Sequence, residues 1–136
     1  MKKSILILTI AVMFTAFFTS CEKDEGNLPN IAFKSGGNYL NHNDTINVGD
    51  TVFVGIQASK SEDKDVLKSF DGSRSYDNGA NNSFMSESLS GSNEDNFSKD
   101  MTLIARNQAG KETYTFTVVN KDGLKNSVSL TLTVIP

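Results

Sequence analysis

From Leu28 to Pro136 the chain alternates apolar and polar residues with a period of two. In the segment DTVFVGIQASK, one side of an extended chain is entirely aliphatic, with Val52, Val54, Ile56 and Ala58. Because successive side chains of a strand point to opposite faces, this pattern predicts a β-strand with one buried face. No part of the region has the 3.6-residue period of an amphipathic helix. The alternation therefore restricts the chain to an all-β fold.

The clearest predicted strand pair lies in the C-terminal third. The segments KETYTFTVVN and NSVSLTLTV both alternate, and Lys121-Asp122-Gly123 between them is typical of a tight turn. One face of this hairpin is apolar, with Tyr114, Phe116, Val118, Val128, Leu130, Leu132 and Val134. The other face carries hydroxyl groups from Thr113, Thr115, Thr117, Thr131 and Thr133. A hydroxylated face suits a sheet with one side in water.

Shorter alternating segments predict the remaining strands. They are NIAFKSG, DTINV, VLKSF (66–70), SFMSESL (83–89) and DMTLIAR (100–106). The connections GSRSYDNGANN and SGSNEDNFSK are polar and rich in turn-forming residues. Strands at this spacing without intervening helices predict two packed antiparallel sheets. We therefore expect one Ig-like antiparallel β-sandwich of about seven strands over residues 30–136.

The N-terminal segment has the features of an export signal. Lys2 and Lys3 precede an almost unbroken apolar run over 5–18, and small residues stand directly before Cys21. The run is shorter than the roughly 20 apolar residues that cross a bilayer, and acidic rather than basic residues dominate the segment after it. We expect residues 1–20 to be a cleaved signal peptide.

Phe18-Thr19-Ser20-Cys21 resembles a bacterial lipobox, and the following EKDEG resembles the acidic export signal of Bacteroidota-type surface lipoproteins. The resemblance implies that Cys21 is acylated and that residues 21–29 form an acidic linker. It also implies an outer-membrane, lipid-anchored protein exposed at the cell surface. The alternative is an ordinary secretory signal cut near Ser20, which leaves Cys21, the single cysteine, as an odd thiol.

The segments NVGDTVFVGIQASK and AGKETYTFTVVNKDGLKNSVSLTLTV resemble the Ig-like, PKD-like modules of such lipoproteins. The resemblance covers roughly 29–136. In such folds a tyrosine at the start of the penultimate strand often bonds back to nearby backbone, and Tyr114 is the candidate for this tyrosine corner. Because these modules serve as spacers, adhesive units and glycan-binding accessories, the resemblance implies no activity.

Charge and residue inventory limit the chemistry. Without Lys2 and Lys3 the chain has 11 basic and 16 acidic residues, a net charge of −5, and no basic cluster, so we expect no nucleic-acid partner. His42 is the only histidine, so the sequence lacks the parts of a zinc cluster or a Ser-His-Asp triad. Acidic loops such as SEDKD lack the glycine of an EF-hand loop. We therefore expect that the protein is not an enzyme and that it binds neither a metal nor a cofactor.

A saccharide-binding surface uses aromatic rings with polar neighbours. If Tyr114 belongs to the core, the candidate ligand-binding residues are Tyr39, Tyr76, Asn78, Asn81 and Asn82. We expect the membrane to be one partner, through the lipid anchor, and a glycan or a protein at the cell surface to be another. The first functional hypothesis is a non-enzymatic binding or adhesion module. The second is a structural or accessory subunit of a membrane uptake or assembly complex, with no ligand of its own.

Overall fold

A computed structural model describes residues 26–136, so the predicted signal, Cys21 and the first part of the linker lie outside the described residues. The described chain forms eight strands and one short 3₁₀ helix. They are β1 (Asn30–Phe33), β2 (Asp44–Asn47), β3 (Thr51–Ser59), β4 (Leu67–Tyr76), β5 (Asn82–Ser88), η1 (Gly91–Glu94), β6 (Asn96–Ile104), β7 (Gly110–Asn120) and β8 (Lys125–Ile135). No helix among residues 26–136 has the length and apolar character to span a membrane.

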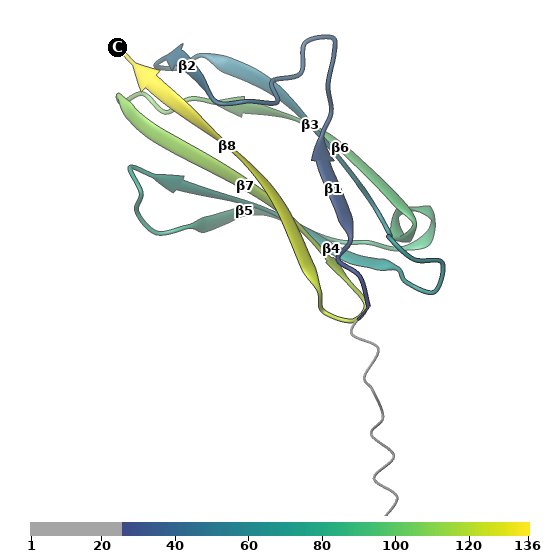
Figure 1. Cartoon of the computed structure of the whole chain (residues 1–136). Helices are drawn as coiled ribbons and strands as arrows, with labels where there is room; N and C mark the ends of the chain where they lie inside the picture. Colours follow the sequence, from purple (N-terminus) through teal and green to yellow (C-terminus); the bar gives the residue numbers. More distant parts are fainter. Residues whose placement is uncertain (1–25) are drawn as a thin grey trace, which may run out of the picture.

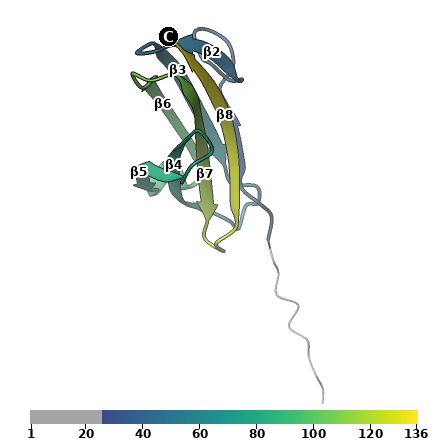
Figure 2. The same cartoon turned by 90° about the vertical axis from the view of Figure 1, so that its left-hand side faces the viewer.

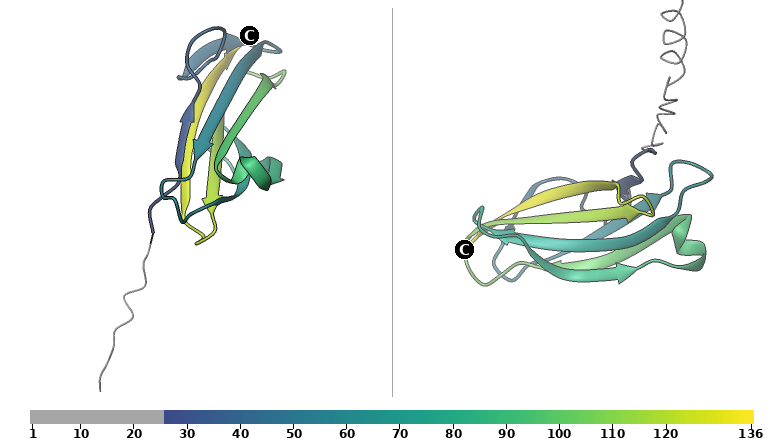
Figure 3. Two further views of the ribbon diagram at one scale, coloured as in Figure 1. Left: turned by 90° about the vertical axis from the view of Figure 1, so that its right-hand side faces the viewer. Right: turned by 90° about the horizontal axis from the view of Figure 1, so that it is seen from below.

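The strands form two sheets that pack face to face. One sheet has the order β1-β3-β6 and the other the order β2-β8-β7-β4-β5. Figure 2 shows the molecule from the side, with β7 and β8 in one layer and β3 and β6 in the other. The left view of Figure 3 shows the three-stranded layer in front of β8. The prediction of an all-β sandwich is therefore confirmed.

Apolar side chains from both sheets fill the space between them. Val54 and Ile56 of β3 face Phe70, Phe116 and their neighbours across the core, and all four are fully buried. The ring centroids of Phe70 and Phe97, which belong to different sheets, are 4.8 Å apart. Burying one such side chain contributes about 1.5–3 kcal/mol, so alternation in sequence becomes the main source of stability.

The predicted hydroxylated face is also present on the outer side of the five-stranded sheet. The hydroxyl oxygens of Thr113 and Thr131 are 3.0 Å apart, and those of Thr117 and Ser127 are 2.8 Å apart. Each pair joins directly opposed residues of β7 and β8. This face is a regular hydroxyl ladder without an exposed aromatic ring.

The structure differs from the sequence-based expectation in three strands. β2 runs parallel to β8, whereas all strand pairs were expected to be antiparallel. β4 continues to Tyr76 through residues expected in a loop, with a register shift between Gly72 and Ser73. β6 begins at Asn96 rather than near Asp100. A bulge in β4 and inward-facing polar side chains in β4 and β6 interrupt the alternation there, which is why the sequence pattern missed these extensions.

One ion pair lies at the open seam between the two edge strands β5 and β6. Lys99 pairs in register with the buried Ile56 and therefore lies on the inner side of β6, and its ammonium group forms a salt bridge with Glu87 of β5. An inward-facing charge is one of the devices by which edge strands avoid pairing with other chains. Lys99 and Glu87 thus close the seam with polar groups.

The molecule has two distinct ends. The entry end comprises residues 26–29, the loop 60–66 and the turn 121–124, and the distal end comprises the C terminus with the loops 77–81 and 105–109 (Figure 1). At the entry end the buried Asn120 donates hydrogen bonds to Asp65 Oδ2 at 2.7 Å and to the carbonyl oxygen of Asn27 at 3.3 Å. Asn126 donates to the carbonyl oxygen of Pro29 at 2.9 Å. Residues 27–29 are therefore attached to the base of the sandwich.

Candidate ligand-binding surfaces

The five candidate ligand residues do not form one site. Tyr76, Asn78, Asn81 and Asn82 lie at or beside the loop between β4 and β5, at the distal end. Tyr39 lies in the connection between β1 and β2 and forms an isolated bridge with Phe53 of β3. The structure thus brings four of the residues together and places the fifth on the three-stranded sheet.

The distal asparagines contribute to the geometry of their own loop. Asp77 and Asn78 both have positive φ angles, 50° and 60°, a backbone region that asparagine and aspartate tolerate better than most residues. Asn81 donates to Ser73 Oγ at 2.9 Å, and Asn82 donates to the carbonyl oxygen of Ala80 at 3.1 Å. All three asparagines remain exposed. They shape the loop and present amide groups to solvent.

A charged and hydrogen-bonded cluster supports this end from within. Glu112 is completely buried and accepts hydrogen bonds from the backbone N–H of Arg106 at 2.8 Å and from the hydroxyl of Tyr114 at 2.7 Å. Arg106 also forms an ion pair with Asp77, at 2.5 Å between Nη2 and Oδ2. Burial, and then the bond to Glu112, raises the pKa of Tyr114 well above its usual value.

Tyr114 therefore belongs to the core, as expected, but the tyrosine-corner prediction is not met. Its hydroxyl donates to the side-chain carboxylate two residues upstream in place of the backbone. Glu112 takes over the role of the backbone acceptor, and it fixes the loop before β7 through the N–H of Arg106.

Tyr39 packs flat over the outer face of the three-stranded sheet. A Cβ at Gly55 would lie 2.6 Å from a ring carbon of Tyr39, so only glycine at this position lets the ring reach the sheet. The ring stacks on Phe53 at 5.0 Å between centroids, and its hydroxyl donates to Asp100 Oδ2 at 2.9 Å. The ring of Tyr39 is thus held in one orientation against this face.

Lys34 completes the group around Tyr39. Its ammonium group is 2.6 Å from Asp100 Oδ1 and 5.6 Å from the centre of the Tyr39 ring. The hydrogen bond from Lys34 lowers the pKa of Asp100, and the same bond raises the pKa of Lys34. The pKa of Tyr39 is raised, mainly by its bond to Asp100. Both ends of the ion pair are therefore held in their charged forms at neutral pH.

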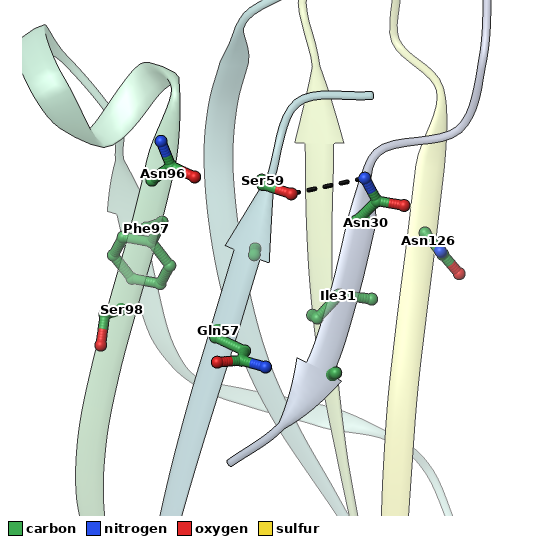
Figure 4. A pocket seen from close by; sticks show the side chains of 10 residues that line it. Asn30, Ile31, Gln57, Ser59, Asn96, Phe97, Ser98 and Asn126 are labelled. Atoms are coloured by element: carbon green, nitrogen blue, oxygen red, sulfur yellow. Dashed lines mark hydrogen bonds between the residues drawn. The ribbon is translucent and has the colours of Figure 1, made fainter. Parts of the chain in front are cut away.

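Beside this group the same face contains a shallow hollow of about 620 Å³ (Figure 4). Its lining has no charged residue, and its polar members are Asn30, Gln57, Ser59, Asn96, Ser98 and Asn126. Two cross-strand rows supply most of them, because Ser59 pairs with Asn30 and Asn96 while Gln57 pairs with Ser98. Asn30 donates to Ser59 Oγ at 3.3 Å. The hollow therefore offers amide and hydroxyl groups from three adjacent strands.

Further along the same outer face, beyond the Lys34–Asp100 ion pair, two apolar side chains are exposed. Phe53 is 39% exposed and Ile104 is 63% exposed, and both lie on the outer side of the three-stranded sheet. Exposed apolar groups beside a concave polar region are typical of binding surfaces. We call the whole surface the β3 face, defined by Tyr39, Phe53, Ile104 and the polar lining of the hollow.

Sequence reasoning identified Tyr39 but missed the rest of the β3 face. Gln57 and Ser59 point outward, and the alternation in the β3 sequence was enough to identify them as members of this face. Asn96 and Ser98 lie in a segment interpreted as a loop, so their alignment with β3 depended on a strand that the sequence pattern did not predict.

Comparisons with known proteins identify the fold only. No protein-family model matches the chain, and no curated protein matches its sequence. A substituted form of the superoxide reductase (neelaredoxin) from Ignicoccus hospitalis is similar in structure, with a TM-score of 0.52 and 10% identity over 83% of this chain and 84% of that chain. A second structure of the reductase from the same organism gives a TM-score of 0.50 and 8% identity, over 80% and 81% of the two chains.

A CARDB domain of the PF1109 protein from Pyrococcus furiosus also matches, with a TM-score of 0.46 and 12% identity over 81% of this chain and 91% of that chain. At these identities the likeness concerns the arrangement of strands. The chain is a β-sandwich domain, and its function has to be argued from its own surfaces.

Proposed function

We propose that the protein is a non-enzymatic binding module, tethered to the outer membrane by a lipid on Cys21, that binds a neutral saccharide on the β3 face. The observation that carries the proposal is the uncharged, amide- and hydroxyl-rich hollow on the same sheet face as the exposed Phe53. It is also consistent with the resemblance to the Ig-like modules of Bacteroidota-type surface lipoproteins.

The chemistry of the hollow matches that of sugar hydroxyls. Each amide offers both a donor and an acceptor, and each serine hydroxyl can serve as either. A neutral saccharide has no charge to neutralise, so a lining without ionised groups avoids the cost of burying an unpaired charge. The exposed ring of Phe53 adds an apolar surface for the C–H groups of a sugar. The other outer face presents the threonine and serine hydroxyl ladder of β7 and β8.

The attachment of the linker supports tethering at the entry end. Asn27 contacts Asn120 and donates to Glu62 Oε1 at 2.6 Å, so the linker meets the sandwich at a fixed place. The six steps between residues from Cys21 to Asn27 reach at most about 20 Å, since an extended chain spans about 3.5 Å per residue. A domain tethered in this way stays close to the membrane and directs its distal end away from it.

His42, the only histidine in the sequence, lies outside the hollow and outside the loop between β4 and β5. The ring lies in an exposed connection between β1 and β2, and its Nδ1 is 3.1 Å from Oδ1 of the neighbouring Asn41. Within residues 26–136 no three His, Cys, Asp or Glu side chains gather in a way that could hold a metal ion.

The binding proposal is tested with the full chain, purified in detergent, on an array of neutral oligosaccharides. We expect binding that Phe53→Ala and Gln57→Ala each weaken by about tenfold, the loss expected for one ring contact or one well-made hydrogen bond. Ser59→Ala, in the hollow, should weaken glycan binding. Its matched control is Ser129→Ala, on the hydroxyl ladder of β7 and β8, which should leave glycan binding unchanged. An array without any bound glycan, or equal losses in both serine variants, would contradict the proposal.

Tethering is tested separately by mass spectrometry of the processed protein. We expect fatty acids on Cys21 and an N terminus at that residue, and Cys21→Ser should release the protein from the membrane fraction. An unmodified thiol in membrane-free protein would overturn the tethering while leaving the binding proposal open to its own test.

The second candidate is an accessory subunit of a membrane uptake or assembly complex. The exposed Ile104, which lies outside the hollow, favours a protein contact at that part of the β3 face. Extraction of the original chain and of Ile104→Asp in mild detergent distinguishes the two candidate functions. A partner that co-purifies with the original chain and is lost in the variant would support the accessory role.

A further inference from the structure

Two arginines lie against the same tyrosine ring at the distal end, and only one of them has a counter-ion. The Cζ atom of Arg106 is 4.5 Å from the centroid of Tyr76, and that of Arg74 is 4.9 Å from it. Arg106 pairs with Asp77 at 2.5 Å and lies 3.6 Å from Glu112. Among residues 26–136, no carboxylate lies within 4.0 Å of the Arg74 guanidinium.

The position of Arg74 is set by the strand and by two rings. It lies opposite Tyr114 of β7 and Asn82 of β5, on the side of β4 that faces the other sheet. Its Cζ atom is also 5.9 Å from the centroid of Phe84, which is 38% exposed. Contacts with aromatic faces stabilise a guanidinium group but leave its N–H bonds, which lie in the plane of the group, without acceptors.

The hydrogen-bond inventory indicates where those N–H groups point. Burial raises the pKa of the Tyr114 hydroxyl, and the positive charge of Arg74 acts against this larger effect to lower it. Within the described part of the chain, Nε of Arg106 is the only buried side-chain nitrogen or oxygen without a hydrogen-bond partner. The N–H donors of Arg74 are therefore accessible to solvent, in a half-buried group that two aromatic rings orient.

We propose that Arg74 anchors a second site, specific for the carboxylate of an acidic saccharide such as a hexuronate. The guanidinium fork pairs with both oxygens of a carboxylate, a geometry that a lysine cannot provide. Phe84, which is 38% exposed, contacts the sugar ring, and Asn82, which pairs with Arg74 across the two strands, supplies an exposed amide for the sugar hydroxyls. This site is separate from the β3 face and does not depend on the function proposed for that face.

The test is isothermal titration of the full chain in detergent with a hexuronate tetrasaccharide and with the corresponding neutral hexose tetrasaccharide. We expect Arg74→Gln to raise the Kd for the acidic ligand at least about tenfold, since a charge-assisted pair is lost. Arg74→Lys should give an intermediate Kd. The control Lys111→Gln removes an exposed charge from the same end and should change the Kd less than twofold.

Three results would overturn the site: an unchanged Kd in Arg74→Gln, equal binding of the neutral ligand, or an equal loss in Lys111→Gln. The last would indicate unspecific attraction to the positive charge of the distal end. Urea unfolding of Arg74→Gln and Arg74→Lys separates loss of binding from loss of folding. Phe53→Ala should leave the acidic ligand unaffected, so this result is independent of the β3 face.

Discussion

The two ends of the sandwich both bury polar side chains, but they use them differently. At the entry end, the amide of Asn120 links the chain that enters the domain to the loop containing Asp65. At the distal end, the carboxylate of Glu112 holds the backbone before β7 and the hydroxyl of Tyr114. The organising side chain at the entry end is a neutral amide, which both donates and accepts hydrogen bonds. At the distal end it is a carboxylate. The first arrangement fixes a strand entry, and the second supports loops that reach into solvent.

The largest expected effect comes from removing the distal carboxylate. Glu112→Ala leaves a buried hydroxyl and a backbone N–H without acceptors, and it removes the nearby charge from Arg106. We expect the free energy of unfolding to fall by about 3 kcal/mol, measured by urea denaturation. Glu112→Gln retains an acceptor and should cost less. A change below about 1 kcal/mol in Glu112→Ala would show that charge does not organise this end.

A smaller effect is expected at the entry end. Asn120→Ala removes the acceptor of the N–H groups of Asp122 and Leu124 and the donor to Asp65, at a cost of about 2 kcal/mol. Amide hydrogen exchange in β1 should become faster, because the chain that leads into this strand loses a contact at its entry. Asn120→Asp should destabilise more than alanine, since it places a second carboxylate against Asp65. If Asn120→Asp restored stability, the contrast between a neutral and a charged end would be lost.

The smallest expected effect is a loss of stability at the distal end when the pH is lowered. The hydrogen bond from Arg106, and then that from the backbone of Lys111, lowers the pKa of Asp77 below its usual value of 3.8. The folded protein therefore binds fewer protons at this site than the unfolded chain, and stability falls as the pH drops through the lowered pKa. Urea midpoints compared at pH 7 and pH 3 should differ less in Asp77→Asn than in the original chain. Asparagine also tolerates the φ of 50° at this position.

The sequence predicted those features of the fold that depend on the alternation of apolar and polar residues. β3 and the β7–β8 hairpin have the expected faces, and Tyr114 lies in the core as expected. Alternation failed where polar side chains point inward, as at Arg74 and Glu112, because no local pattern contains the aromatic rings, the hydroxyl and the loop backbone that they contact. The candidate residues around Asn78 were found as turn formers, and whether they bind a ligand stays a prediction. The hollow on the β3 face required the pairing of β3 with β6, which no local pattern contains.

The salt bridge between Lys99 and Glu87 has a consequence for copies of the protein held close together on one surface. The two strands that border the seam expose backbone donors and acceptors that could extend the sheet of a neighbour. An intruding strand would have to strip water from an ammonium and a carboxylate before its own apolar residues could enter. Copies can therefore collide often in a crowded layer and still separate as individual folded units.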